Sequence, residues 1–136
     1  AARRRARYQQ NQLLGFEAAA LLRENPRRDG IRIVRCAFTD RDPAQLRALA
    51  SRLAANGGTV VLLGTGGQRA QLVFARAGDA VGQMDDLLQH ALSLLEGARG
   101  GGTATFAQGG GPVAPVARVE QVLAEAERLL RAKLVA

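Results

Sequence analysis

Apolar and polar residues alternate along the chain with two different periods, and these periods predict its elements. In four segments the apolar residues recur at the spacing of one helix face, and four shorter runs are continuously apolar or alternate as strands do. The predicted helices cover residues 3–24, 43–55, 81–96 and 116–134, and the predicted strands cover 31–38, 59–63, 69–75 and 103–107. The order α-β-α-β-β-α-β-α predicts an α/β fold, a four-stranded mixed sheet with packed helices, preceded by an N-terminal connecting helix.

Proline, glycine and capping residues mark where several elements end. Pro26 ends the first helix, because the residue before a proline avoids the α conformation. Asp42 and Pro43 suit the N-cap and the first position of the second helix, and Asp79 or a neighbour suits the cap of the third. The glycine turn at 64–67 joins two strands close enough in sequence to form an antiparallel hairpin, and it lacks the lysine and following helix of a P-loop.

The first helix differs from the others because it is polar over much of its length. Its apolar stripe consists of Tyr8, Leu14, Ala18, Leu21 and Leu22. We expect residues 1–26 to be a helical connector, which joins a preceding domain or pairs with a second copy in a homodimer, and 27–136 to be the globular domain. Because the chain begins without methionine in an arginine-rich sequence, we expect it to be the C-terminal piece of a longer protein.

The net charge of +7 lies entirely in the first 56 residues. These hold twelve arginines and five acidic residues, whereas the rest of the chain holds seven basic and seven acidic residues. Eighteen of the nineteen basic residues are arginine, whose planar guanidinium pairs with two phosphate oxygens at once. The charge therefore favours nucleic acid as the partner, and a solvated basic surface is the alternative.

Residue types that carry catalysis are scarce in this chain. Cys36 is the only cysteine and His90 the only histidine, which excludes an internal disulfide and a multi-cysteine zinc site. The only serines, Ser51 and Ser93, both fall inside predicted helices. We expect no catalytic residues, no metal and no cofactor. No apolar run is long enough to span a bilayer, so we expect a soluble, cytoplasmic protein that has no membrane partner.

Glycine is concentrated in one stretch, residues 97–111, which holds seven of the sixteen glycines. Two glycine triplets flank the alternating run 103–107, and we expect two tight turns that hold one strand. Consecutive exposed N–H groups in such turns bind anions, and Arg99 beside the first triplet adds a phosphate donor. A flexible linker is the alternative; Phe106 and Gln108 disfavour it, because linkers rarely carry a large apolar residue.

The run 94–111, an apolar helix end followed by a glycine triplet and Ala-Gln in register, resembles the signature of the DHH-associated domain. That domain forms the C-terminal module of alanyl-tRNA synthetases and of some free-standing alanyl-tRNA editing proteins. In the family pattern, Gly-Gly-Lys-Gly-Gly-Gly precedes Arg-Pro-Asp-Met-Ala-Gln. Arg99 stands at the lysine, 100–102 match the triplet, and Ala107 and Gln108 match Ala-Gln, whereas 103–105 depart from Arg-Pro-Asp. The resemblance covers roughly residues 31–132.

The resemblance implies a tRNA-binding module that holds tRNA for a separate catalytic domain of an alanyl-tRNA synthetase-like or aminoacyl-tRNA editing protein. Two other functions stay open: an oligomerisation module built on the first helix, and the substrate-binding half of a DHH phosphoesterase, which usually carries histidine where Thr103 stands. The residues expected to contact nucleic acid are Arg99, Gly100, Gly101, Gly102 and Gln108. A basic track of Arg27, Arg28, Arg32 and Arg35 is expected to extend this site.

Overall fold

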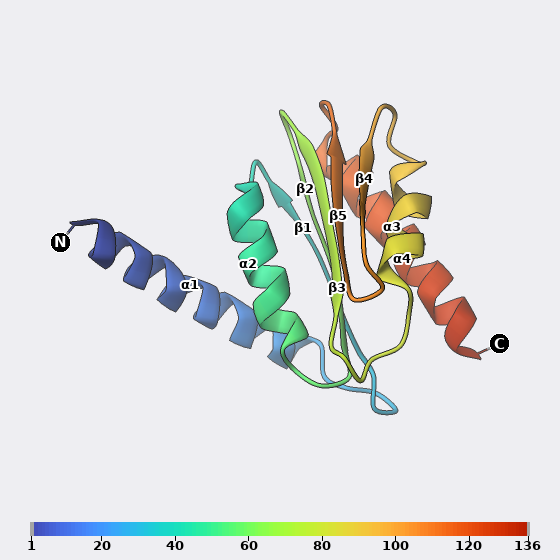
Figure 1. The fold of residues 1–136 in the computed structure, drawn as a ribbon, viewed down its shortest axis with the longest axis horizontal. Helices are drawn as coiled ribbons and strands as arrows, with labels where there is room; N and C mark the ends of the chain where they lie inside the picture. Colours follow the sequence, from blue (N-terminus) through green and yellow to red (C-terminus); the bar gives the residue numbers. More distant parts are fainter. Residues whose placement is uncertain (1, 136) are drawn as a thin grey trace.

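The computed structural model describes residues 2–135 and arranges them in four helices and five strands (Figure 1). The helices are α1 (Ala2–Glu24), α2 (Pro43–Ala54), α3 (Met84–Leu92) and α4 (Val116–Val135). The strands are β1 (Arg32–Thr39), β2 (Thr59–Gly66), β3 (Ala70–Arg76), β4 (Arg99–Gly102) and β5 (Phe106–Gly111). The α/β class is confirmed, but the sheet has one strand more than the four predicted.

One mixed sheet runs through the molecule in the order β1-β2-β3-β5-β4. β1 and β2 are parallel and are connected through α2, while every other neighbouring pair is antiparallel. The predicted hairpin of the second and third strands is therefore confirmed. β2 is buried at every position, as its continuous apolar run indicates, and β1 and β4 form the two edges of the sheet.

The glycine-rich stretch forms a hairpin of two strands, so the single strand predicted between two glycine turns is wrong. The triplets lie in β4 and β5, and residues 103–105 form the turn. The Thr103 N–H donates to the Phe106 carbonyl oxygen at 2.8 Å, and the Phe106 N–H donates to Thr103 Oγ1 at 3.2 Å. A hydroxyl that bonds nearby main chain in this way closes a turn. Thr103 is thus a turn residue, although its alternation with apolar neighbours imitates a strand.

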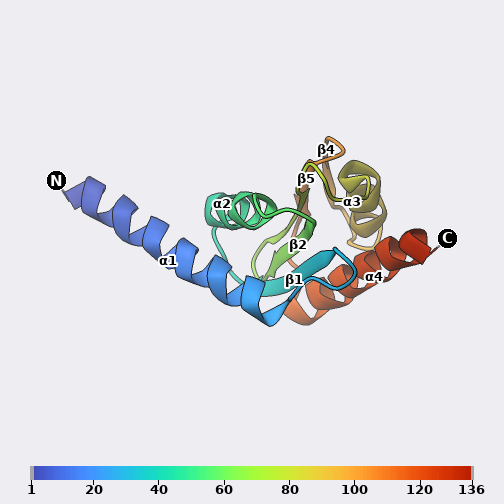
Figure 2. The same cartoon turned by 90° about the horizontal axis from the view of Figure 1, so that it is seen from below.

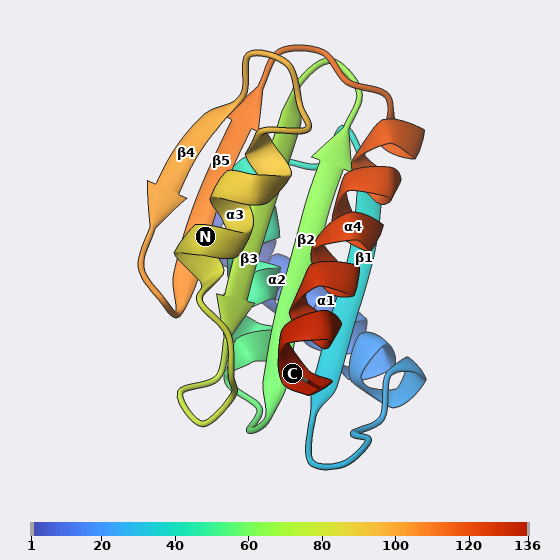
Figure 3. The same cartoon turned by 90° about the vertical axis from the view of Figure 1, so that its right-hand side faces the viewer.

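Helices cover both faces of the sheet (Figures 2 and 3). α1 and α2 lie on one face, where α2 packs on β2 and β3, and α3 and α4 lie on the other. Two apolar clusters fill the spaces between these layers. The cluster under α2 includes Leu46, Leu49, Leu53, Val61, Leu63 and Val73, and the cluster under α3 and α4 includes Leu62, Leu72, Phe74, Leu88, Val122 and Leu123.

Some helix ends differ from the sequence-based expectation. The third helix covers only Met84–Leu92 of the predicted 81–96, and Asp79 does not cap it. The Asp79 carboxylate instead accepts a hydrogen bond from the Gly58 N–H at 2.9 Å and so joins two loops. Asp42 does occupy the N-cap of α2 before Pro43, but its side chain makes no capping hydrogen bond.

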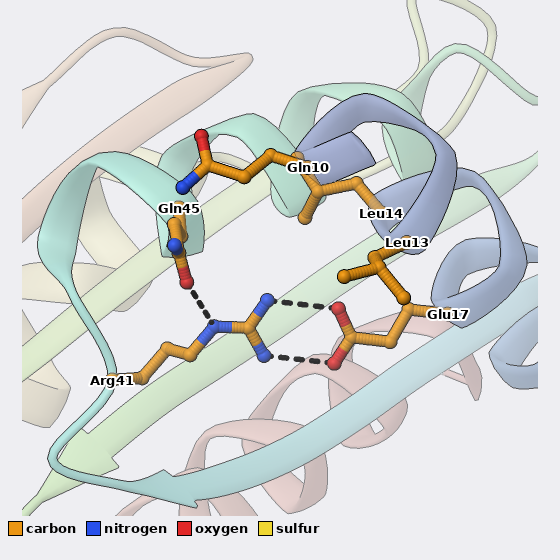
Figure 4. A pocket seen from close by; sticks show the side chains of 6 residues that line it. All are labelled: Gln10, Leu13, Leu14, Glu17, Arg41 and Gln45. Atoms are coloured by element: carbon orange, nitrogen blue, oxygen red, sulfur yellow. Dashed lines mark hydrogen bonds and ion pairs between the residues drawn. The ribbon is translucent and has the colours of Figure 1, made fainter. Parts of the chain in front are cut away.

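The second half of α1 is anchored to the body of the domain. Leu14 and Ala18 are buried against the α2 cluster, and Glu17 forms a two-pronged ion pair with Arg41 at 2.7 and 2.8 Å (Figure 4). Leu14, Glu17 and Arg41 border an open hollow of about 300 Å³ between α1 and α2. The first half of α1 projects away from the domain, and its residues 4–13 are all exposed (Figures 1 and 2). No helix in the range 2–135 is both long enough and apolar enough to cross a bilayer.

Candidate nucleic-acid interface

The free edge of β4 presents main-chain groups to solvent. All four of its residues, Arg99–Gly102, are exposed, and β5 pairs with only one side of the strand. The Gly100 carbonyl oxygen accepts a hydrogen bond from Gln89 Nε2 of α3 at 2.7 Å, so it points away from β5. Because the N–H and C=O of one residue in an antiparallel strand point to the same side, the N–H groups of Gly100 and Gly102 also point outward. The edge thus offers two donors beside the Arg99 guanidinium.

Most glycines of this hairpin are required by the close approach of its strands. A Cβ on Gly100 would lie 2.3 Å from the Gly109 Cα, and a Cβ on Gly102 would lie 2.3 Å from the Phe106 carbonyl oxygen. No side chain fits at such distances, so these glycines are necessary for the hairpin itself. Their number is therefore weak support for a ligand.

Gly101 is different, because nothing in the domain requires its lack of a side chain. Outside its chain neighbours, the nearest atom to a Cβ placed there is Gln89 Nε2, at 3.9 Å. The residue lies inside a strand, where glycine is unfavourable by roughly 0.5–1 kcal/mol relative to alanine. Across the strand pair, Gln108 has a buried Oε1 with no hydrogen-bond partner among the described residues. An open glycine and an unsatisfied amide therefore lie in one cross-strand pair.

The four arginines of the predicted basic track lie elsewhere. Arg32 and Arg35 belong to β1, and Arg27 and Arg28 belong to the turn before it, so all four lie at the edge opposite β4. The expectation that they extend the glycine site is wrong, because the order of strands places β2, β3 and β5 in between. Arg35 forms an ion pair with Glu127 at 3.3 Å, and Arg32 Nε donates to the Asn25 carbonyl oxygen at 2.8 Å.

Comparisons with known proteins relate this fold and sequence to alanyl-tRNA synthetase, although no family model matches the chain. The alanine–tRNA ligase of Methanoregula boonei is 44% identical over 73 residues, which are 54% of this chain and 8% of that protein. The crystal structure of the C-Ala domain of Aquifex aeolicus alanyl-tRNA synthetase superposes with a TM-score of 0.61 at 23% identity, over 79% of this chain and 95% of that one.

A segment of 73 residues is thus similar in sequence to an alanine–tRNA ligase, and the fold is similar to that of a C-Ala domain. The chain spans only a small part of the ligase that it matches.

The structure adds candidate residues that the sequence did not reveal. In the cross-strand row that contains Arg99, Gly110 of β5 and Gln71 of β3 follow in turn. Arg69, which is exposed, immediately precedes β3 at the same end of the sheet. Arg69 and Gln71 stand some thirty positions before Arg99 in the chain, so only the pairing of β3 with β5 brings them near it.

Chemically reactive side chains are dispersed in the described part of the chain. Between residues 2 and 135, no three histidine, cysteine, aspartate or glutamate side chains gather so that they could hold a metal ion. His90 is exposed, as expected. Cys36 is half-buried, and burial, with a smaller contribution from the negative charges of Glu17 and Glu24, raises the pKa of its thiol. A thiol in such surroundings stays protonated and is a poor nucleophile.

Proposed function

We propose that this chain is a tRNA-binding module that contacts the sugar-phosphate backbone of its RNA through the free edge of β4. The observation that carries this proposal is Gly101, a strand glycine that is exposed and that has room for a side chain. Glycine at such a position allows an external group to reach the main chain without a Cβ in the way. The outward N–H groups of its neighbours then act as phosphate donors.

The charge and hydrogen-bonding groups around Gly101 suit a phosphodiester. Arg99 supplies a guanidinium that can donate two hydrogen bonds to one phosphate. Gln108 Oε1, which is buried without a hydrogen-bond partner among the described residues, can accept a hydrogen bond from a ribose hydroxyl if the side chain rotates outward. Contacts of this kind position RNA without reading its sequence, as is common for folded RNA that proteins recognise by shape and 2′-hydroxyl groups.

Within a longer protein, such a module raises the local concentration of tRNA at a separate catalytic domain. The similarity to alanine–tRNA ligase makes a cytoplasmic alanyl-tRNA synthetase-like or alanyl-tRNA editing protein the best-supported setting. We infer that the chain is related to the wider family of DHH-associated domains. The substrate-binding half of a DHH phosphoesterase is less well supported, because Thr103 closes the hairpin turn where those proteins usually carry histidine.

Binding of an alanine tRNA to the full chain, measured against salt concentration, tests the proposal. Arg99→Ala should weaken binding and lower the slope of log K against log salt by about one, because one phosphate contact is lost. Gly101→Val should also weaken binding, since its side chain occupies the point of approach. Gly78→Val is the matched control, because Gly78 is likewise exposed and a Cβ there has nothing within 4 Å. If the binding curves of the wild type, Arg99→Ala and Gly101→Val overlay one another at every salt concentration, the proposal is refuted.

Self-association through α1 is the second candidate function, and the structure changes its basis. The apolar stripe expected to be left partly exposed packs inside the domain: Leu14 and Ala18 are buried, and Leu21 and Leu22 lie against the core. Three large side chains of α1 are exposed, namely Tyr8 of the predicted stripe at 64%, Leu13 at 65% and Phe16 at 70%. Sedimentation of Leu13→Gln/Phe16→Gln beside wild type tests this candidate, and equal monomer masses for the two would exclude it.

A further inference from the structure

The projecting half of α1 carries an unusual concentration of positive charge. Arg4, Arg5 and Arg7 are exposed and lie within the first two turns of the helix. No acidic residue occurs in the chain before Glu17. We call residues 4–13 the basic arm, since every one of them is exposed and the segment contains three arginines and no acid.

Nothing else in the described structure neutralises the arm. The ion pairs of residues 2–135 join α4 to β1, α1 to Arg41, and neighbouring turns of α4. The first acidic residue of α1, Glu17, already has both carboxylate oxygens bonded to Arg41. The arm's charges therefore face solvent without a protein partner.

A surface poor in acidic side chains continues from the arm onto α2. The twelve residues of α2 include Arg47 and Arg52 and no acid. Arg52 reaches back to α1, because its Nη1 would lie 3.0 Å from a Cβ on Gly15. α2 lies between α1 and the β4–β5 hairpin in the ribbon views (Figures 1 and 2). An elongated polyanion can thus pass from the arm over α2, because the one carboxylate at the hollow between the two helices, Glu17, is already paired with Arg41.

We propose that the basic arm is a second contact surface for the phosphate backbone of the same RNA, separate from the β4 edge. The proposal rests on the proposed function for the identity of the ligand, and it adds a surface that the glycine motif does not predict. RNA suits the arm better than a lipid surface does, because three glutamines and one asparagine separate Tyr8 from Leu13 and leave the arm no continuous apolar face. Association with phosphates here depends on charge and not on sequence.

The test is tRNA binding by the full chain against salt for Arg4→Ala/Arg7→Ala. Each lost phosphate contact lowers the slope of log K against log salt by about 0.7–0.9, so the double variant should lose about 1.5. Arg23→Ala is the matched control, because Arg23 is an exposed arginine in the last turn of the same helix. Its curve should stay close to that of the wild type.

Circular dichroism separates a structural role from binding. Alanine has the highest helix propensity of all residues, so replacing two exposed arginines with it should leave the helix content unchanged or raise it. A loss of RNA binding without a loss of helix therefore supports the proposal. If the wild type fails to bind tRNA, the proposed function itself is wrong. If Arg99→Ala weakens binding while the double variant overlays the wild type, the β4 site stands and the arm is refuted. Binding to phosphatidylserine vesicles is measured with the same variants. If Arg4→Ala/Arg7→Ala binds the vesicles less well but binds tRNA as the wild type does, the arm is likewise refuted as an RNA surface.

Discussion

The ion pair between Arg41 and Glu17 should fix the direction in which α1 leaves the domain. Both guanidinium Nη atoms donate to the carboxylate, at 2.7 and 2.8 Å, and Arg41 Nε donates to Gln45 Oε1 at 3.1 Å (Figure 4). The guanidinium also lies over the Phe38 ring, 4.8 Å from its centroid. The exposed fractions of the two charged side chains are 18% and 34%, which places the pair between a buried and a surface ion pair.

The expected coupling follows from this intermediate burial. Exposed pairs contribute about 0.2–1 kcal/mol, and two-pronged arginine–carboxylate pairs are stronger, so we expect about 1–2 kcal/mol in a double-mutant cycle of Arg41→Ala and Glu17→Ala. Arg41→Ala alone should cost more than Glu17→Ala, since it also removes the contact with Phe38, a term of roughly 0.5–1 kcal/mol. The pair should weaken as salt is added, because it is only partly shielded from solvent.

Urea unfolding gives the stability terms, and amide hydrogen exchange shows where they act. Both single variants should speed exchange in residues 14–22 of α1 and leave β2 protected, because only the helix anchor is lost. The matched control is the pair of Arg128 and Glu125 on α4, whose arginine side chain is 64% exposed, so its coupling should be smaller. A coupling for Arg41 and Glu17 as small as that of the control would refute the reasoning.

Three further predictions concern single positions. Gly66→Ala should destabilise the domain by about 1–3 kcal/mol in urea unfolding, because its Cβ would lie 2.7 Å from the main-chain N of Val116. Gly100→Val should abolish the protection of the hairpin amides in hydrogen exchange, because the valine side chain has no space between the strands, whereas Gly101→Val should preserve this protection. Burial raises the pKa of the Cys36 thiol in the folded protein above that of a free thiol. Its contribution to the free energy of unfolding is therefore fully present below the pKa of a free thiol and is lost as the pH rises through the pKa of the folded state. Cys36→Ala should make the alkaline decline in the free energy of unfolding less steep.

Much of the fold could be predicted because local patterns agree with the final packing. The continuous apolar run of β2 predicted a buried central strand, and the Asp42-Pro43 pair predicted the start of α2. The helix stripe of α4 likewise faces the core at Val119, Val122 and Leu123. The end of α3 could not be placed, because the residues after Leu92 keep apolar spacing while the chain turns toward β4.

The hairpin was mispredicted because glycine has no side chain to reveal which face of a strand it occupies. Residues 100–102 and 109–111 carry no periodicity, so the only visible pattern was the short alternation at 103–107. That alternation belongs to a turn closed by Thr103. The site was only partly predictable for a similar reason: the motif located Arg99, but the strand order places Arg32 and Arg35 at the opposite edge, and strand order is a long-range property.

A glycine motif mixes residues that a fold needs with residues that a ligand needs, and the two can be separated by stability. Gly100 and Gly102 have no space for a Cβ, so any substitution there damages both the domain and its binding. Gly101 has space and lies in a strand, where alanine loses less conformational freedom on folding than glycine does. Gly101→Ala should therefore raise the free energy of unfolding by a few tenths to about 1 kcal/mol while it weakens tRNA binding. Opposite signs in the two measurements are the mark of a residue kept for a ligand, and a change that weakens neither would leave Gly101 without a role in binding.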